Sequence, residues 1–112
     1  MRTSIMAEKG AKPMGPYSHA IVCSGKMLFV SGQGPLVPET GDLLSEFRAA
    51  AVQTLKNIRT IVEAAGATMG DVVKVQAYLR DMADFAVFNE VYQEFFTPPY
   101  PARTTVQSDL TI

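Results

Sequence analysis

The stretch DVVKVQAYLRDMADFAVFNEVYQEFF, residues 71–96, decides the fold, because its hydrophobic period changes in the middle. The first half, DVVKVQAYLRD, alternates its side chains in the manner of a β-strand. The second half repeats apolar residues at helical spacing, and Asp81 with Asp84 three positions later resembles a capping box. We therefore predict a strand followed at once by an amphipathic helix. The apolar stripe of this helix consists of Phe85, Phe88, Tyr92, Phe95 and Phe96.

The segments on both sides extend this pattern. Residues 45–65 repeat apolar side chains at helical spacing, with Ser45 able to cap the start and Gly66 placed for a left-handed C′ position. Prolines within residues 98–101 end the other helix, and ARTTVQS, residues 102–108, predicts a last strand. Nearer the N-terminus, AIVC (20–23) and MLFVSG (27–32) predict two short strands around a glycine turn. This order favours an α+β fold with both helices on one face of a sheet.

Length and composition restrict the class of protein. With 112 residues the chain is long enough for one hydrophobic core, so we expect a single domain over residues 1–112. A net charge of −1 and scattered basic residues argue against a nucleic-acid or membrane-surface partner. The one cysteine, Cys23, fits a reducing compartment, and no apolar run is long enough to cross a bilayer. We therefore expect a cytoplasmic protein.

The residues that could carry chemistry are few. His19 and Cys23 are the only histidine and cysteine, too few for a zinc site without carboxylates that the sequence does not place beside them. The glycines lack the spacing of a phosphate loop, and no serine lies in a nucleophile elbow. Arg103 stands out because a charged guanidinium among apolar neighbours needs an anionic partner. Chemistry without a cofactor, or binding alone, is what remains.

Five blocks follow one another along nearly the whole chain: GPYSHA (15–20), LFVSGQGPLVPETGDL (28–43), QTLKNIRTIVEAAG (53–66), the stretch 71–96, and PYPARTTV (99–106). Together they resemble the reactive intermediate deaminase, or YjgF-like, family. The resemblance implies a chorismate-mutase-like mixed sheet with two helices on one face, assembled as a homotrimer with clefts between subunits. It also implies hydrolysis of reactive enamines and imines, such as 2-aminoacrylate, to 2-keto acids and ammonia without metal or organic cofactor.

The resemblance assigns Arg103 as the residue that grips the substrate carboxylate. A planar guanidinium suits this task because it donates two parallel hydrogen bonds to a carboxylate. The resemblance also places Thr105 at the substrate, in a position where many relatives have cysteine, so no thiol takes part here. The alternative for Arg103 is a structural ion pair with an aspartate or glutamate, which is the commoner role of arginine.

The same matching places four more residues at the substrate. Tyr17 of GPYS lines the cleft, the backbone of Ser31 and Gly32 in VSGQ contacts the substrate, and Asn89 of VFNEVY lies near the site. Each has a structural alternative: a packed aromatic ring for Tyr17, a sheet hydroxyl for Ser31, backbone conformation for Gly32, and a solvated helix position for Asn89. His19 stands where the family motif usually has glutamine, and we interpret it as structural.

Two expectations concern surfaces. Apolar residues occupy both alternating registers of the predicted strands, so the sheet face away from the helices is expected to pack against further copies of the chain. These residues include Leu28, Val30, Val72 and Tyr78. The resemblance also implies one more strand, with a glutamate that positions the attacking water, beyond the last residue, Ile112. We expect a truncated sequence rather than a natural loss, because a missing strand would leave a sheet edge uncovered.

Three functions stay open at this point. The first is the imine deaminase. The second is a translation-inhibiting ribonuclease, which the negative net charge and the lack of a histidine pair disfavour. The third is a non-catalytic trimer that binds small acids or acts as a chaperone. The sequence does not name the preferred imine or its pathway.

Overall fold

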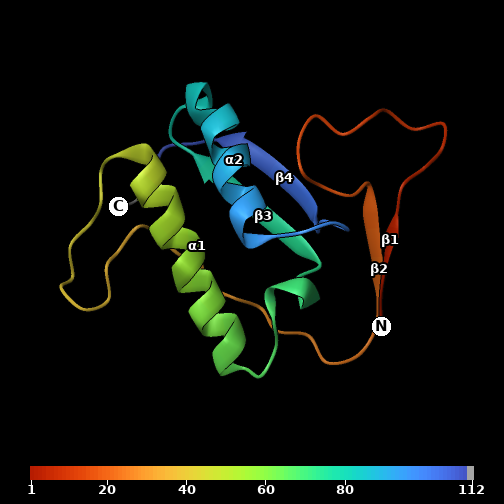
Figure 1. The fold of residues 1–112 in the computed structure, drawn as a ribbon, viewed down its shortest axis with the longest axis horizontal. Coiled ribbons are helices and arrows are strands. Elements are labelled where there is room, and N and C mark those ends of the chain that lie inside the picture. Colours follow the sequence, from red (N-terminus) through yellow and green to blue (C-terminus); the bar gives the residue numbers. More distant parts are fainter. Residues whose placement is uncertain (111–112) are drawn as a thin grey trace.

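Two helices and two small sheets make up the fold of residues 1–110, the part of the chain that this computed structural model describes (Figure 1). The sheets contain two strands each, and two short 3-10 helices precede β3 and α2. The elements in chain order are β1 (Arg2–Ile5), β2 (Ala20–Cys23), α1 (Phe47–Ala64), η1 (Met69–Asp71), β3 (Lys74–Leu79), η2 (Met82–Asp84), α2 (Phe85–Phe95) and β4 (Ala102–Gln107). The predicted α+β class is confirmed.

The strand and helix predicted within residues 71–96 are confirmed as β3 and α2. β4, the predicted last strand, pairs with β3 in parallel, and α2 supplies the crossover that a parallel pair requires. In this register Val75 lies opposite Arg103, and Ala77 lies opposite Thr105. Because side chains alternate along a strand, these four residues point to the same face of the sheet.

The core lies between this face and the two helices. A single buried cluster contains residues from α1, from β3 and from the second helix with its C-cap: Ala51, Leu55, Ala77, Leu79, Phe88, Val91, Tyr92 and Phe96. Both helices therefore pack on the same face of the β3–β4 sheet. On the opposite face Tyr78 is 53% exposed. Val72, which we expected on that outer face, instead packs against the core cluster.

The N-terminal part differs from prediction. β2 is confirmed, but its partner is the unpredicted β1, which pairs with it antiparallel from Arg2 opposite Cys23 to Ile5 opposite Ala20. No strand forms over residues 27–32, and Phe29 there is 87% exposed. An alternating pattern produces a strand only where a second backbone pairs with it, and within residues 1–110 nothing pairs with this stretch. The strands consequently form two separate sheets instead of the single mixed sheet expected.

The helix ends follow local chemistry. Glu46, not the predicted Ser45, caps α1, because its carboxylate accepts hydrogen bonds from the backbone N–H groups of Arg48 and Ala49. Gly66 has a φ of +84°, which confirms the predicted left-handed position after the helix. Within the described residues, neither helix has the length and apolar character that crossing a membrane demands.

Candidate functional site

Arg103 lies on β4, where its side chain points toward α2 and is only 9% exposed. Aromatic rings surround its guanidinium. The guanidinium carbon lies 4.9 Å from the ring centre of Tyr92, 5.3 Å from that of Phe88, and 5.6 Å from those of Phe85 and Tyr17. Rings at these distances attract a cation through their π faces but offer it no hydrogen-bond acceptor there. The surroundings thus hold the charge in place without pairing it.

The guanidinium has no anionic partner among residues 1–110. The ion pairs found there join Arg48 to Glu90 and Glu94 and do not include Arg103, and the Nη1 atom of Arg103 is buried without a hydrogen-bond partner. Burial lowers the pKa of Arg103, yet an arginine remains charged at neutral pH. A buried charge without a partner is costly, so an arginine kept this way indicates a site for an external anion. The structural ion pair considered above is not found in this part of the chain.

Other polar atoms near Arg103 also lack partners. Asn89 Oδ1, Thr105 Oγ1 and the Tyr92 hydroxyl are buried without hydrogen bonds within the described residues. A cavity of about 400 Å³ opens beside Arg103 and is lined by Met14, Tyr17, Met82, Phe85, Arg103 and Thr105. One strong donor and several unused acceptors therefore lie at or next to one cavity.

Gly15 brings the loop before β2 against Arg103 and Asn89. A Cβ atom built on Gly15 would lie 3.0 Å from Nη2 of Arg103 and 3.3 Å from both polar atoms of the Asn89 amide. Tyr17, two residues later, accepts a hydrogen bond from the backbone N–H of Met14 through its hydroxyl, at 3.1 Å. The predicted residues Arg103, Thr105, Tyr17 and Asn89 are thus brought together.

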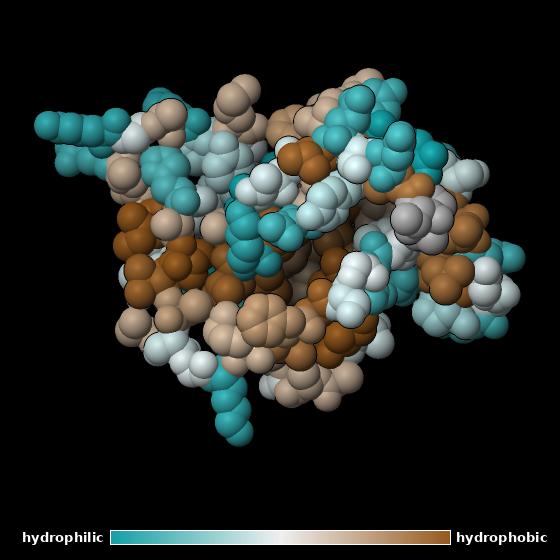
Figure 2. Space-filling model, turned by 180° about the vertical axis from the view of Figure 1, so that it is seen from behind, coloured by the Kyte–Doolittle hydropathy of each residue, from teal (hydrophilic) through white to brown (hydrophobic). Residues whose placement is uncertain are grey.

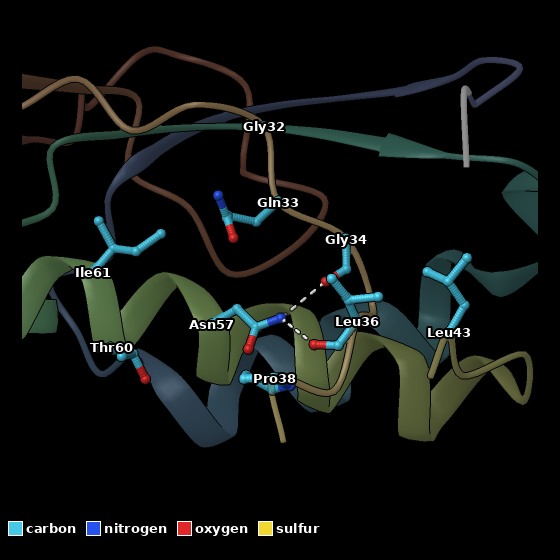
Figure 3. Close-up of a pocket in the computed structure, with 9 residues that line it drawn as sticks. All are labelled: Gly32, Gln33, Gly34, Leu36, Pro38, Leu43, Asn57, Thr60 and Ile61. Carbon is cyan, nitrogen blue, oxygen red and sulfur yellow. Dashed lines mark hydrogen bonds between the residues drawn. The ribbon is translucent and has the colours of Figure 1, made fainter. Parts of the chain in front are cut away.

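Ser31 and Gly32 lie elsewhere in this chain. Gly32 lines a separate cavity of about 440 Å³ between α1 and the loop that precedes it (Figure 3). There Asn57 of α1 points at the loop and donates hydrogen bonds to the carbonyl groups of Gly34 and Leu36, at 3.1 and 2.8 Å. Ser31 is exposed, and its carbonyl accepts only a long hydrogen bond from Gln33, at 3.4 Å. Their contact with a substrate stays a prediction.

Known proteins resemble this chain along most of its length. The family model described as Endoribonuclease L-PSP, which represents the YjgF or RidA proteins, matches residues 8–111. The chain belongs to this family. It is 46% identical over 108 residues to a RutC family protein of Pyrococcus horikoshii, covering 96% of this chain and 85% of that one. It is 39% identical over 110 residues to the 2-iminobutanoate/2-iminopropanoate deaminase of Escherichia coli K12, with the same coverage.

Solved structures of the RidA family share the fold. The crystal structure of RidA from the Antarctic bacterium Psychrobacter sp. PAMC 21119 aligns with a TM-score of 0.73 and 43% identity, over 95% of this chain and 85% of that one. The predicted resemblance is therefore confirmed. Within the described residues, no group of three or more His, Cys, Asp or Glu side chains could hold a metal ion.

Several residues around the Arg103 cavity were not predicted as site residues. Phe85, Phe88 and Tyr92 were predicted as the apolar stripe of a helix, which they are, but they also surround the guanidinium. Met14 and Met82 line the cavity, and no pattern in the sequence indicated that they belong to a site. Gly15 could have been recognised from the sequence, because a glycine directly before a proline and a site tyrosine allows the backbone to approach other side chains closely.

The Tyr92 phenol leads to a prediction about alkaline pH. Its hydroxyl is buried, and burial raises the pKa of Tyr92 above its ordinary value. The folded protein then keeps a proton that the unfolded chain loses above about pH 10, so the free energy of unfolding should be unaffected below that pH and fall above it. Tyr92→Phe has no phenol to titrate, so this contribution to the fall in the free energy of unfolding should be absent in the variant.

Urea unfolding below and above about pH 10 measures the effect. The matched control is Tyr78→Phe, which alters a tyrosine that is 53% exposed. If the wild type and Tyr92→Phe lost equal stability on the same pH step, the interpretation of Tyr92 would be wrong.

Proposed function

We propose that the protein hydrolyses reactive 2-imino and 2-enamine acids, such as 2-aminoacrylate, to 2-keto acids and ammonia, without a cofactor. The observation that carries this proposal is the buried, unpaired guanidinium of Arg103 beside an open cavity. The name of the Escherichia coli relative supports it, because 2-iminobutanoate and 2-iminopropanoate are both 2-imino carboxylates. We further propose that the reaction takes place in the cytoplasm, where the single cysteine, Cys23, stays reduced.

The residues of the site suggest how the reaction proceeds. Arg103 binds the substrate carboxylate through two parallel hydrogen bonds, and the surrounding rings limit its motion. An enamine is first protonated at C3 to give the imine. Water then adds its oxygen to C2, the C–N bond breaks, and the nitrogen leaves as ammonia while C2 becomes a ketone. The unpaired oxygen atoms of Asn89 and Thr105 accept hydrogen bonds from the imine nitrogen or from the attacking water.

A homotrimer completes the proposed site. Large apolar side chains are exposed in two places. Tyr78 (53%) lies on the outer face of the sheet, and Leu28 (49%), Phe29 (87%) and Val30 (36%) lie in the stretch 27–32. Figure 2 shows hydrophobic residues gathered on the face behind the helices. Exposed patches of this kind mark protein interfaces, and closed symmetry buries them without an open edge. In this arrangement Ser31 and Gly32 of one subunit reach the Arg103 cavity of the next.

A trapping assay tests the proposed function. An amino-acid oxidase generates 2-imino acids from amino acids, and semicarbazide competes with hydrolysis for them. The protein should lower the rate of semicarbazone formation while ammonia release continues, and prior dialysis against EDTA should not change this. A trapping rate that the protein leaves unaltered would contradict the deaminase. Incubation with RNA is the parallel arm, and RNA fragments formed in the absence of imine turnover would favour the ribonuclease.

Gly15→Ala should lower the activity. Its Cβ atom would crowd Arg103 at 3.0 Å and Asn89 at 3.3 Å, so these side chains must move by a few tenths of an ångström. We expect kcat/KM for imine hydrolysis to fall by about three- to tenfold, which is less than the roughly 100-fold loss that a misplacement of about 1 Å can cause. Gly70→Ala is the control, because a Cβ atom there meets only Thr68, at 3.5 Å. Equal activity of the two variants would argue against close packing of Gly15 at the site.

A further inference from the structure

The imidazole of His19 is held on three sides by the loop between β1 and β2. Its Nδ1 atom accepts a hydrogen bond from the backbone N–H of Ala7 at 2.9 Å, and its Nε2 atom lies 2.5 Å from the carbonyl oxygen of Ala11. Gly10 packs so closely that a Cβ atom there would lie 2.8 Å from Cε1 of the ring. The ring thus bridges two backbone groups of one loop and fills the space that Gly10 leaves.

These contacts require a neutral ring. A carbonyl oxygen can only accept, so Nε2 must carry the proton, and the Ala7 N–H can only donate, so Nδ1 must carry none. A protonated imidazole has N–H groups on both nitrogens, and the one on Nδ1 would face the N–H of Ala7. Protonation therefore breaks one of the two hydrogen bonds and replaces it with a repulsive contact.

The loop that His19 holds is one wall of the Arg103 cavity. Between Ala11 and His19 it contributes Met14 and Tyr17 to the lining and Gly15 to the packing against the guanidinium. Figure 1 shows this loop extending from the β1–β2 hairpin toward β4. Ser18, the residue before His19, anchors this end of the loop, because its backbone N–H donates to the Pro101 carbonyl at 3.0 Å. The His19 ring reaches back to the Ala11 carbonyl and so holds the start of the loop to the same end.

Within residues 1–110, no ion pair to the His19 ring takes over the role of these two hydrogen bonds. The loop itself carries Glu8, Lys9 and Lys12, and β1 contributes Arg2, whose guanidinium donates to the carbonyl groups of Val72 and Pro99. Among residues 1–110, no carboxylate forms an ion pair with the His19 ring. Histidine is the side chain whose protonation ordinarily changes between about pH 5 and 8.

We propose that His19 is a positioning residue that makes the substrate site sensitive to pH. The neutral ring holds the loop wall against Arg103, and protonation releases the wall and weakens the binding of 2-keto and 2-imino carboxylates. The effect on the substrate rests on the function proposed above, whereas the effect on the loop does not. His19→Gln is the informative variant, because its amide can accept from Ala7 and donate to Ala11 at every pH.

The test compares wild type and His19→Gln at about pH 8 and about pH 5.5, on either side of the range in which histidine titrates. NMR hydrogen exchange gives the protection factor of the Ala7 amide relative to amides of the β3–β4 sheet, and titration with 2-oxobutanoate gives its affinity. In the wild type both should fall by about tenfold at the lower pH, as expected for loss of one hydrogen bond. In His19→Gln both should stay constant. Equal pH dependence in the two proteins would overturn the proposal.

Two further NMR measurements on the wild type test the role of His19 without the variant. Nitrogen spectra of the wild-type ring should show the proton on Nε2 at the higher pH, and the Gly15 and Tyr17 amide signals should shift together with ring protonation. These signals decide the role of His19 even if the variant folds poorly. Failure of 2-oxobutanoate to bind at the higher pH would instead count against the proposed function. If the Gly15 and Tyr17 signals did not change when the ring is protonated, the coupling of His19 to the site would be refuted.

Discussion

Replacing Arg103 with alanine should lower kcat/KM for imine hydrolysis by about 100- to 1,000-fold, because hydrogen bonds to a charged group contribute about 1.5–3 kcal/mol each. Arg103→Lys should lose most of the activity as well. An ammonium is a point charge and cannot reproduce the two parallel hydrogen bonds of a guanidinium. The trapping assay with 2-imino acids measures both variants, and thermal unfolding shows whether they remain folded.

Folding should survive these substitutions, since Arg103 makes no ion pair or hydrogen bond that the rest of the described chain depends on. Arg48→Ala is the matched control. It removes an exposed arginine that pairs with Glu90 at 2.7 Å and lies on α1, so its activity should remain close to that of the wild type. Near-wild-type keto-acid release by a folded Arg103→Ala protein would rule out the proposed role of the guanidinium.

The second large effect concerns assembly. The protein should behave in solution as a trimer of 12.2 kDa chains, and Phe29→Glu should dissociate it and abolish most of the activity. Phe29 is 87% exposed in the single chain, and a charge buried there in an interface would be strongly unfavourable. Light scattering coupled to size-exclusion chromatography gives the mass, and the same fractions are assayed for turnover.

Lys56→Glu controls for the added negative charge, because Lys56 is an exposed residue of α1 on the helical side of the molecule. It should remain trimeric and active. A 12.2 kDa monomer that hydrolysed imine at the wild-type rate would refute both the trimer and the shared cleft.

The parts of the fold that the sequence predicted are those governed by local chemistry. β3, α2 and β4 were predictable because alternation, helical spacing and prolines act over a few neighbouring residues. β1 was not predicted, since its four residues carry a weak pattern and are defined by their pairing with β2, some twenty residues away. The same dependence on long-range pairing explains the wrong strand over residues 27–32. The cap at Glu46 was missed because Ser45 is an equally suitable residue one position earlier.

The site was predictable to a similar degree. Arg103 was recognisable because a permanent charge among apolar residues requires an explanation, and the structure leaves that charge unpaired within residues 1–110. The rings around it were not recognisable as site residues, because the stripe on α2 is equally well explained by core packing. Ser31 and Gly32 lie away from the Arg103 cavity in the single chain, so their contact with a substrate stays a prediction that rests on the proposed trimer.

A crystal structure with bound 2-oxobutanoate would test the central claim most directly. This keto acid has the carboxylate of the proposed substrates and does not hydrolyse further. We expect both of its carboxylate oxygen atoms to accept hydrogen bonds from the Arg103 guanidinium at about 2.7–2.9 Å, the range typical of charge-assisted pairs. The keto group should then lie in the cavity beside Thr105 and Tyr17. A carboxylate bound away from Arg103, or an Arg103 already paired with a protein carboxylate, would contradict the account.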